Sequence, residues 1–141
     1  MFDIDISDPI SFSNSGLTKL DGGKYGKEKW SAKEWPVVYL IYNSKEVYIG
    51  ETVDAKNRMA QHLANERRRI LDDFVLISDG TFNKSVTQDL EAWLIQHMIA
   101  DTKFEKIQNR NFGFQIHSYY DDKQYESLFG DVWNKMRKRN L

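Results

Sequence analysis

The stretch that decides the fold runs from Val37 to His62 and reads VVYLIYNSKEVYIGETVDAKNRMAQH. It contains two short runs of β-branched and aromatic residues, 37–42 and 46–49, on either side of a polar Asn-Ser-Lys turn. Such runs are typical of a β-hairpin, because branched and aromatic side chains pack well on a pleated surface. We expect Gly50 to end the second strand.

A helix is predicted to follow the hairpin. The apolar residues from Val53 onward recur at helical spacing, and Thr52 or Asp54 can cap the first turn through a side-chain oxygen. Arg58 and His62 lie four residues apart, so they project from one face of this helix. An arginine and an imidazole therefore stand side by side directly after the hairpin.

Beyond this stretch the chain predicts one more strand and two more helices. Residues 74–77 are typical of a strand. Ser85 and Gln88 form a capping-box signature that opens a helix, and residues 125–136 follow helical spacing. We therefore expect an α/β (α+β) fold, with a small central, mainly antiparallel three-stranded sheet flanked by helices and an extra C-terminal helix.

The composition indicates one cytoplasmic domain. At 141 residues and 40% hydrophobic content the chain can bury one core. It has no cysteine, which fits a reducing compartment and requires any metal to bind oxygen or imidazole ligands. No run approaches the roughly 20 apolar residues of a membrane span, and the acidic start is unlike a signal peptide. We expect no membrane contact.

The net charge of −1 gives no overall attraction to a polyanion, so any attraction must be local. Arg67–Arg69 follow the first helix directly. Lysines that could complete a basic rim lie just before the hairpin, at Lys24, Lys27, Lys29 and Lys33. The alternative is that the arginine run is an ordinary solvated face.

The chain resembles the GIY-YIG endonucleases in several elements that occur in the same order. Tyr39 corresponds to the tyrosine of the family's first motif, and Tyr-Ile-Gly at residues 48–50 is the second motif unaltered. Arg58 falls ten residues after Tyr48, as the family pattern expects, and His62 stands where many members have histidine. Several elements in the same order are more specific than any one of these short motifs.

The resemblance extends to two later residues and breaks at two positions. Glu91 lies in a Glu-x-x-Leu-Ile segment like the one that carries the family's metal ligand. Asn109 is the better match for the family's asparagine, and Asn111 is the fallback. Val37 replaces the glycine of the first motif, and Glu51 stands where some members have lysine.

The resemblance covers roughly residues 36–113 and suggests how the chain is organised. We expect an irregular N-terminal arm at 1–35, a nuclease core at 36–113, and a C-terminal helical extension at 114–141 packed on the core. Some bacterial proteins of this type carry an ATPase- or helicase-like region, so such a region, attached or separate, is an expected partner. The chain would then be the nuclease module of a larger DNA-processing protein.

The activity that the resemblance implies is metal-dependent hydrolysis of DNA phosphodiester bonds. Glu91 would hold one Mg²⁺, with Mn²⁺ as a substitute, because such hard cations accept a single carboxylate together with waters and substrate phosphate. Arg58 would hold a phosphate oxygen through its planar fork of donors. Asn109 would fix the geometry around the metal or the tyrosine.

The general base is open between two residues. By analogy with the family, Tyr48 is the first choice, and Tyr39 would position the water or the phosphate. Tyrosine is a poor base at its free pKa near 10, so a nearby cation must favour its ionised form. His62 is the rival base, because an unperturbed imidazole has a better pKa for this task.

A binding module on the same fold is the alternative to an enzyme. It would dock nucleic acid or a protein with little or no catalysis, and Glu51, Val37 and the near-neutral charge favour it. In this interpretation the tyrosines are strand aromatics packed against a helix, Arg58 and His62 are an exposed pair, and Glu91 forms an ion pair with Arg58.

Overall fold

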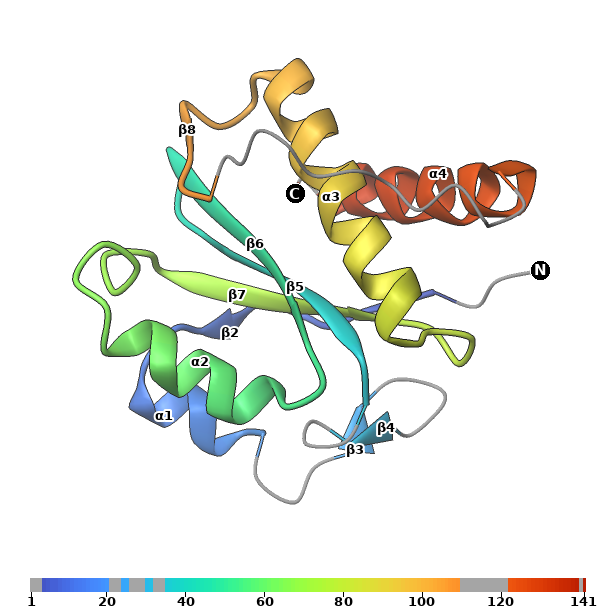
Figure 1. Cartoon of the computed structure of the whole chain (residues 1–141). Helices are drawn as coiled ribbons and strands as arrows, with labels where there is room; N and C mark the ends of the chain where they lie inside the picture. The colour runs from blue at the N-terminus through green and yellow to red at the C-terminus, as the bar shows by residue number, and fades with distance from the viewer. Residues whose placement is uncertain (1–3, 21–23, 26–29, 32–34, 110–121, 140) are drawn as a thin grey trace.

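A mixed sheet runs through the centre of the molecule, and helices lie on both of its faces (Figure 1). The computed structural model describes residues 4–20, 24–25, 30–31, 35–109, 122–139 and 141. The elements in chain order are β1 (Asp5–Ile6), β2 (Ile10–Ser11), α1 (Asn14–Thr18), β3 (Lys24–Tyr25), β4 (Trp30–Ser31), β5 (Val37–Tyr42), β6 (Glu46–Thr52), α2 (Ala55–Leu63), β7 (Asp73–Ser78), α3 (Lys84–Asp101), β8 (Lys106–Ile107) and α4 (Asp122–Lys138). Among the described helices, none combines the length and the hydropathy that a membrane span requires.

Six strands form the main sheet, in the order β1-β7-β5-β6-β8, with β2 also paired to β7. The predicted hairpin is its centre: β5 pairs antiparallel with β6 on one side and with β7 on the other, and β8 joins β6 in parallel. The predicted α/β class is confirmed, but the predicted count of three strands was wrong. The added strands β1, β2 and β8 are two residues long each, too short to show an alternating pattern.

Strand β5 is buried on both of its faces, and residues Val37–Ile41 are all inaccessible to solvent. Val38 and Leu40 belong to the core cluster under α3 and α4, whereas Tyr39 and Ile41 belong to the cluster under α1 and α2. These two pairs of helices lie on opposite sides of the sheet (Figure 1). Coverage of both faces explains why the sequence of β5 is continuously apolar.

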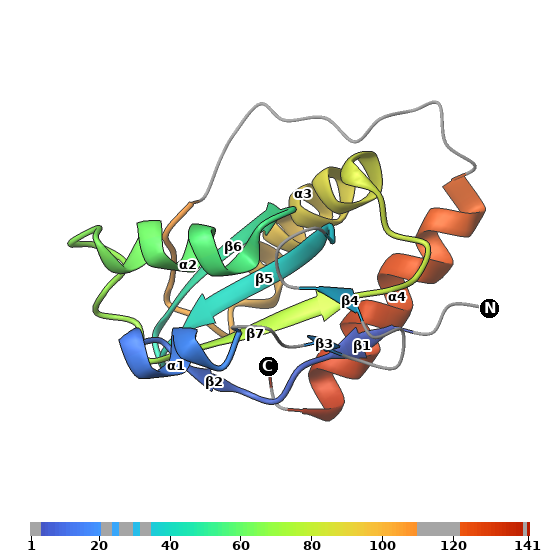
Figure 2. The ribbon, with the colours of Figure 1, turned by 90° about the horizontal axis from the view of Figure 1, so that it is seen from below.

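The described part of the N-terminal arm carries short strands and joins both core clusters. Ile4 and Ile6 pack with α4, whose end lies beside β1 (Figure 2). Lys135 and Arg139 donate hydrogen bonds to the carbonyl oxygens of Ile4 and Ile6, respectively. On the other face the arm contributes Ile10, Phe12, Leu17 and Leu20. The boundaries of arm, core and extension at residues 35 and 113 stay a prediction.

The element ends differ from the expectation at two places. Strand β6 continues past Gly50 to Thr52, because its residues remain paired with β5 to that point. Helix α2 is capped by Asp54, one of the two expected caps. Helix α3 is capped by Asn83, so the predicted capping box at Ser85 was wrong. Asn83 has the extended backbone and the side-chain acceptor that an N-cap needs, one residue before the helix starts.

Candidate active site

Two tyrosines of the central hairpin lie together on the α2 side of the sheet. The rings of Tyr39 and Tyr48 stack at an interplanar angle of 17° with their centroids 6.3 Å apart, and both are buried. Tyr39 is the register partner of Gly50. A Cβ atom at position 50 would lie 2.2 Å from the hydroxyl oxygen of Tyr39. The glycine of the Tyr-Ile-Gly motif is therefore a packing requirement of the first tyrosine.

Hydrogen bonds join α2 to Tyr39. The Tyr39 hydroxyl lies 2.7 Å from Nε2 of His62, and Nε of Arg58 donates to the same hydroxyl at 3.3 Å. Burial raises the pKa of Tyr39 well above its ordinary value, so this phenol keeps its proton. Burial, followed by the charges of Arg58 and Arg68, lowers the pKa of His62 to about 3. The imidazole is therefore neutral near pH 7, and the hydrogen bond between its Nε2 and the Tyr39 hydroxyl joins the two side chains.

The charge of Arg58 has no counterion among the residues that the structure describes. Its Nη1 donates to Oε1 of Gln61 at 3.0 Å, and its pKa is raised first by the hydrogen bond to Tyr39. The Arg58–Glu91 ion pair that the sequence left open is not among the described ion pairs. The guanidinium thus lies beside the tyrosine hydroxyl without a described ion-pair partner, and its charge acts on the Glu91 carboxyl.

Arg68 is a site residue that the sequence pattern did not single out. Its guanidinium carbon lies 4.3 Å from the centroid of the Tyr48 ring, and the side chain is half-buried. Its neighbours Arg67 and Arg69 are exposed. The sequence showed three adjacent arginines of equal rank, and only the turn geometry distinguishes the middle one. Of the four lysines expected in the same basic rim, the structure describes no side chain.

Glu91 approaches the site from α3, on the other face of the sheet. It is half-buried, and burial, followed by the charge of Glu51, raises the pKa of its carboxyl to about 7. The charge of Glu91 also acts on Tyr39, so the carboxyl and the phenol share one electrostatic environment. Glu91 forms no described ion pair or hydrogen bond, which leaves its carboxylate oxygens open to a cation.

Glu51, the residue that departs from the family pattern, is paired with a cation from α3. Both of its carboxylate oxygens accept hydrogen bonds from Nζ of Lys84 at 2.8 Å, and Thr87 donates to one of them at 3.3 Å. Lys84, Thr87 and Glu91 are spaced three and four residues apart, so they share one face of α3. Lys84 therefore offsets the negative charge that Glu51 brings next to Gly50.

Asn109 acts on the backbone of β6. Its Oδ1 accepts a hydrogen bond from the Ile49 amide at 3.1 Å, and its Nδ2 donates to the Ile49 carbonyl. The side chain thus continues the pairing of β8 along the edge of β6, between Tyr48 and Gly50. Both of its polar groups are engaged, so it holds the strand that carries the motif. Asn111, the fallback, lies outside the described residues.

The donor set near Glu91 fits a cation that needs few protein ligands. The described residues contain no group of three or more His, Asp or Glu side chains that could enclose a metal. Mg²⁺ commonly binds through one or two carboxylates, keeps several waters and takes further oxygens from a substrate phosphate. Mn²⁺ shares this preference for oxygen ligands. A single half-buried carboxylate without a described partner is compatible with such a site.

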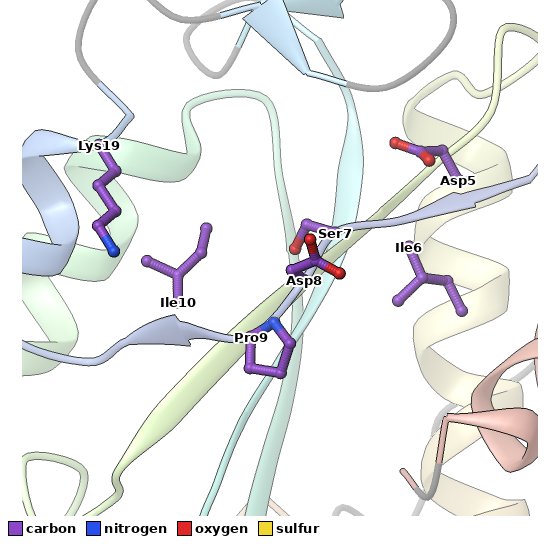
Figure 3. A pocket seen from close by; sticks show the side chains of 7 residues that line it. All are labelled: Asp5, Ile6, Ser7, Asp8, Pro9, Ile10 and Lys19. Atoms are coloured by element: carbon purple, nitrogen blue, oxygen red, sulfur yellow. The ribbon is translucent and has the colours of Figure 1, made fainter.

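A separate cavity of about 500 Å³ lies in the N-terminal arm (Figure 3). It is lined by residues 5–10 and Lys19, so it adjoins β1 and β2. Both strands pair with β7, which lies next to β5 on the side away from β6. The cavity shares no lining residue with the tyrosine site.

The structure brings Tyr39, Tyr48, Arg58 and His62 into mutual contact, and comparison with known families gives them a common context. Residues 36–103 match the family model of the GIY-YIG catalytic domain. Searches among curated proteins and among solved structures gave no match. The matched segment runs from β5 through α3 and includes Glu91, whereas Asn109 lies beyond it. The match over residues 36–103 therefore supports the assignment of this segment to the GIY-YIG endonuclease superfamily.

Proposed function

We propose that the chain is a metal-dependent endonuclease that hydrolyses phosphodiester bonds in DNA. One observation carries the proposal beyond family membership. Two stacked tyrosines, an Arg58 bound to one of them, and a Glu91 carboxyl that interacts electrostatically with Tyr39 and Arg58 support it. Phosphodiester hydrolysis needs these groups together, because charge builds on the phosphate while a water is positioned and activated.

Arg58 is the proposed phosphate-binding residue. Its Nε is bound to Tyr39 and its Nη1 to Gln61, so the side chain is fixed from two directions before any ligand binds. A guanidinium presents a planar fork of donors that matches two oxygens of a phosphate. Prior fixation reduces the conformational entropy that binding would otherwise cost.

Tyr48 is the proposed general base, and the hydrogen-bond network supports it over His62. The Nε2 of the imidazole is already hydrogen-bonded to the Tyr39 hydroxyl, and its pKa of about 3 makes it a weak base near pH 7. Tyr39 is unsuited to the role because its raised pKa keeps it protonated. We therefore assign Tyr39 and His62 to positioning, with Tyr39 holding Arg58, and leave proton removal to Tyr48.

Glu91 is the proposed ligand of Mg²⁺, with Mn²⁺ as a substitute. When bound, the cation would neutralise charge on the phosphate and stabilise the departing oxygen. Asn109 would contribute indirectly, because it fixes the strand backbone between Tyr48 and Gly50. Lys84 would offset the negative charge that Glu51 brings to the same end of β6.

The proposed context is a DNA-processing system with an ATPase- or helicase-like region, attached or separate. The family match supports a nuclease module and covers residues 36–103 of the chain. A reading frame that continues past Leu141 into such a region would support the attached form. Co-purification of an ATPase with the tagged chain from its native host would support the separate form.

Plasmid nicking tests the proposal. Purified protein is incubated with supercoiled plasmid with Mg²⁺, with Mn²⁺ and with a chelator, beside a Glu91→Gln variant whose fold is checked by circular dichroism. We expect nicking that requires the metal and is lost in the variant. Folded wild-type protein that binds labelled DNA but leaves the plasmid intact under all metal conditions would instead establish the binding module.

A further inference from the structure

Two arginine side chains converge on the tyrosine pair without an ion-pair partner among the described residues. Arg58 contacts the hydroxyl of Tyr39, and the Arg68 guanidinium lies over the ring of Tyr48. Neither forms an ion pair with another described residue. Several other described cations are paired with carboxylates, as in Lys84–Glu51, Lys106–Glu46, Arg137–Asp101 and Arg139–Asp8. The tyrosine site therefore concentrates positive charge in a chain whose net charge is −1.

Arg68 is held in this position by an ordered turn. Its amide donates to the Asn65 carbonyl at 3.2 Å, and its own carbonyl accepts from the Leu71 amide at 2.9 Å. The Asn65 side chain also accepts from the Arg67 amide at 2.9 Å. These bonds leave Arg67 and Arg69 exposed and turn Arg68 towards Tyr48. The inward direction of the middle arginine is thus built into the backbone.

The Arg68 side chain has a donor that the described structure does not satisfy. Its Nε is buried and lacks a hydrogen-bond partner among the described residues. Buried polar groups in native proteins almost always have a partner, so such a donor points to an acceptor supplied from outside the described chain. An anionic oxygen fits both the unsatisfied donor and the local charge.

We propose that Arg68 binds a second phosphate of the nucleic-acid strand, next to the phosphate that Arg58 binds. The inference rests on the proposed function, because it takes the ligand of Arg58 to be the phosphate under attack. The two guanidiniums lie at different parts of the tyrosine pair, one at a hydroxyl and one at a ring face, so they serve different phosphates. The site then requires a strand that continues beyond the reacting bond, which favours internal over terminal cleavage.

Binding measurements without divalent metal test Arg68 independently of cleavage. The probe is a fluorescein-labelled oligonucleotide titrated with wild-type protein, Arg68→Ala and the matched control Arg69→Ala, which removes the same charge from the same turn. We expect Arg68→Ala to weaken binding roughly tenfold or more, as for loss of one charge-assisted contact. We expect Arg69→Ala to weaken it less than about threefold, as for a screened surface charge.

A chemical change in the ligand identifies the contacted phosphate. Single methylphosphonate groups, which remove one phosphate charge at a time, are placed along the oligonucleotide. A methylphosphonate at one internal position should lower the affinity of the wild-type protein as much as the Arg68→Ala substitution does. The same methylphosphonate should not lower the affinity of Arg68→Ala any further. This scan on the wild-type protein also tests the inference if Arg68→Ala fails to fold.

Three results would overturn the assignment. The first is that Arg68→Ala and Arg69→Ala weaken oligonucleotide binding equally. The second is that the methylphosphonate scan finds no sensitive phosphate other than that of the cleaved bond. The third is that the wild-type protein does not bind the oligonucleotide. Failure of the proposed nuclease would look different: the binding pattern would stand while the same oligonucleotide stayed uncut after addition of Mg²⁺ or Mn²⁺.

Discussion

Gly50 shows how one residue decides whether the site can form. The Tyr39 hydroxyl occupies the space that a side chain at position 50 would need. A Cβ atom built there would lie 2.2 Å from the hydroxyl oxygen. We expect Gly50→Ala to displace Tyr39, to lower thermal stability and to abolish nicking. Gly130→Ala in α4 is the matched control, because its Cβ would meet nothing within 4 Å. That change should keep activity and stabilise the helix by about 0.5 to 1 kcal/mol. Full activity in Gly50→Ala would contradict the packing argument.

Glu91 is predicted to reduce stability when it is charged. Its carboxyl has a pKa of about 7 in the fold and an ordinary value of 4.5, so the folded state binds the proton more tightly. The favourable contribution is present below pH 4.5 and is lost as pH rises through 7. At pH 8 we expect Glu91→Gln to be more stable to unfolding than wild type, by on the order of 1 to 3 kcal/mol. At pH 4 we expect the two proteins to be equally stable.

The measurement for Glu91 is urea unfolding of both proteins in a chelator, followed by the same pair in Mg²⁺. Added Mg²⁺ should stabilise wild type and leave Glu91→Gln unchanged, because a ligand that binds the native state shifts unfolding. If Glu91→Gln is inactive and also less stable than wild type at pH 8, the charged carboxylate makes stabilising contacts that outweigh the cost of its burial.

His62 gives the opposite pH dependence. Its pKa falls from an ordinary 6.5 to about 3 in the fold, so the unfolded chain binds the proton more tightly. The stabilising contribution is complete above pH 6.5 and is lost as pH falls towards 3. The free energy of unfolding of wild type should fall more steeply than that of His62→Gln across this range, by up to about 1.4 kcal/mol per pH unit. Parallel curves in urea titrations at stepped pH would exclude a buried neutral imidazole.

At the scale of elements, the edge of β6 is completed by a side chain. Asn109 satisfies the amide and carbonyl of Ile49 just beyond the two-residue strand β8. Asn109→Ala would leave two strand groups unpaired, at a cost of about 1 to 3 kcal/mol each where water cannot replace the partner. We expect a lower melting temperature and a larger loss of activity than stability alone explains, because the strand carries Tyr48.

Asn109→Asp separates the two hydrogen bonds. The carboxylate can still accept from the Ile49 amide but can no longer donate to its carbonyl, so we expect a defect close to that of Asn109→Ala. Thermal melts and nicking rates of the three proteins, measured together, decide the point. Wild-type behaviour of Asn109→Asp would place the role of this residue elsewhere than on the strand edge.

The elements that the sequence predicted are those with long or regular patterns. The hairpin, α2 and α3 were predicted because residues 37–62 and the apolar stripe around Glu91 repeat at strand or helix spacing. The two-residue strands β1, β2 and β8 have no such period, and they exist because β7 and β6 offer free edges. Arg68 was not recognised for a similar reason: a backbone turn, rather than a residue type, separates it from Arg67 and Arg69.

At the scale of the whole molecule, the site spans the sheet. The tyrosines, Arg58 and His62 lie on the α2 side, whereas Glu91 comes from α3 on the other side. The two groups are coupled electrostatically, because the charge of Glu91 acts on Tyr39 and that of Arg58 acts on Glu91. The proposed function needs a phosphate-binding arginine from α2 and a carboxylate from α3, so it depends on how these two helices are placed across the sheet.

The family domain is predicted not to fold alone. Both core clusters are completed by segments outside residues 36–113. The arm supplies Ile4, Ile6, Ile10, Phe12, Leu17 and Leu20, and α4 supplies Leu128, Phe129, Val132 and Met136. Burial of each large apolar side chain contributes about 1.5 to 3 kcal/mol, so their combined loss exceeds a typical net stability of about 5 to 15 kcal/mol.

We therefore expect a fragment of residues 36–113 to lack a cooperative thermal transition and to show poorly dispersed amide resonances, while the full chain melts cooperatively. A chain that lacks residues 1–20 but retains α4 should be intermediate or unfolded, since it loses one side of β7 together with the apolar cover of α2. A cooperative melt of the 36–113 fragment near the temperature of the full chain would mean that arm and α4 are attachments to a self-sufficient core, and that the nuclease site needs neither of them.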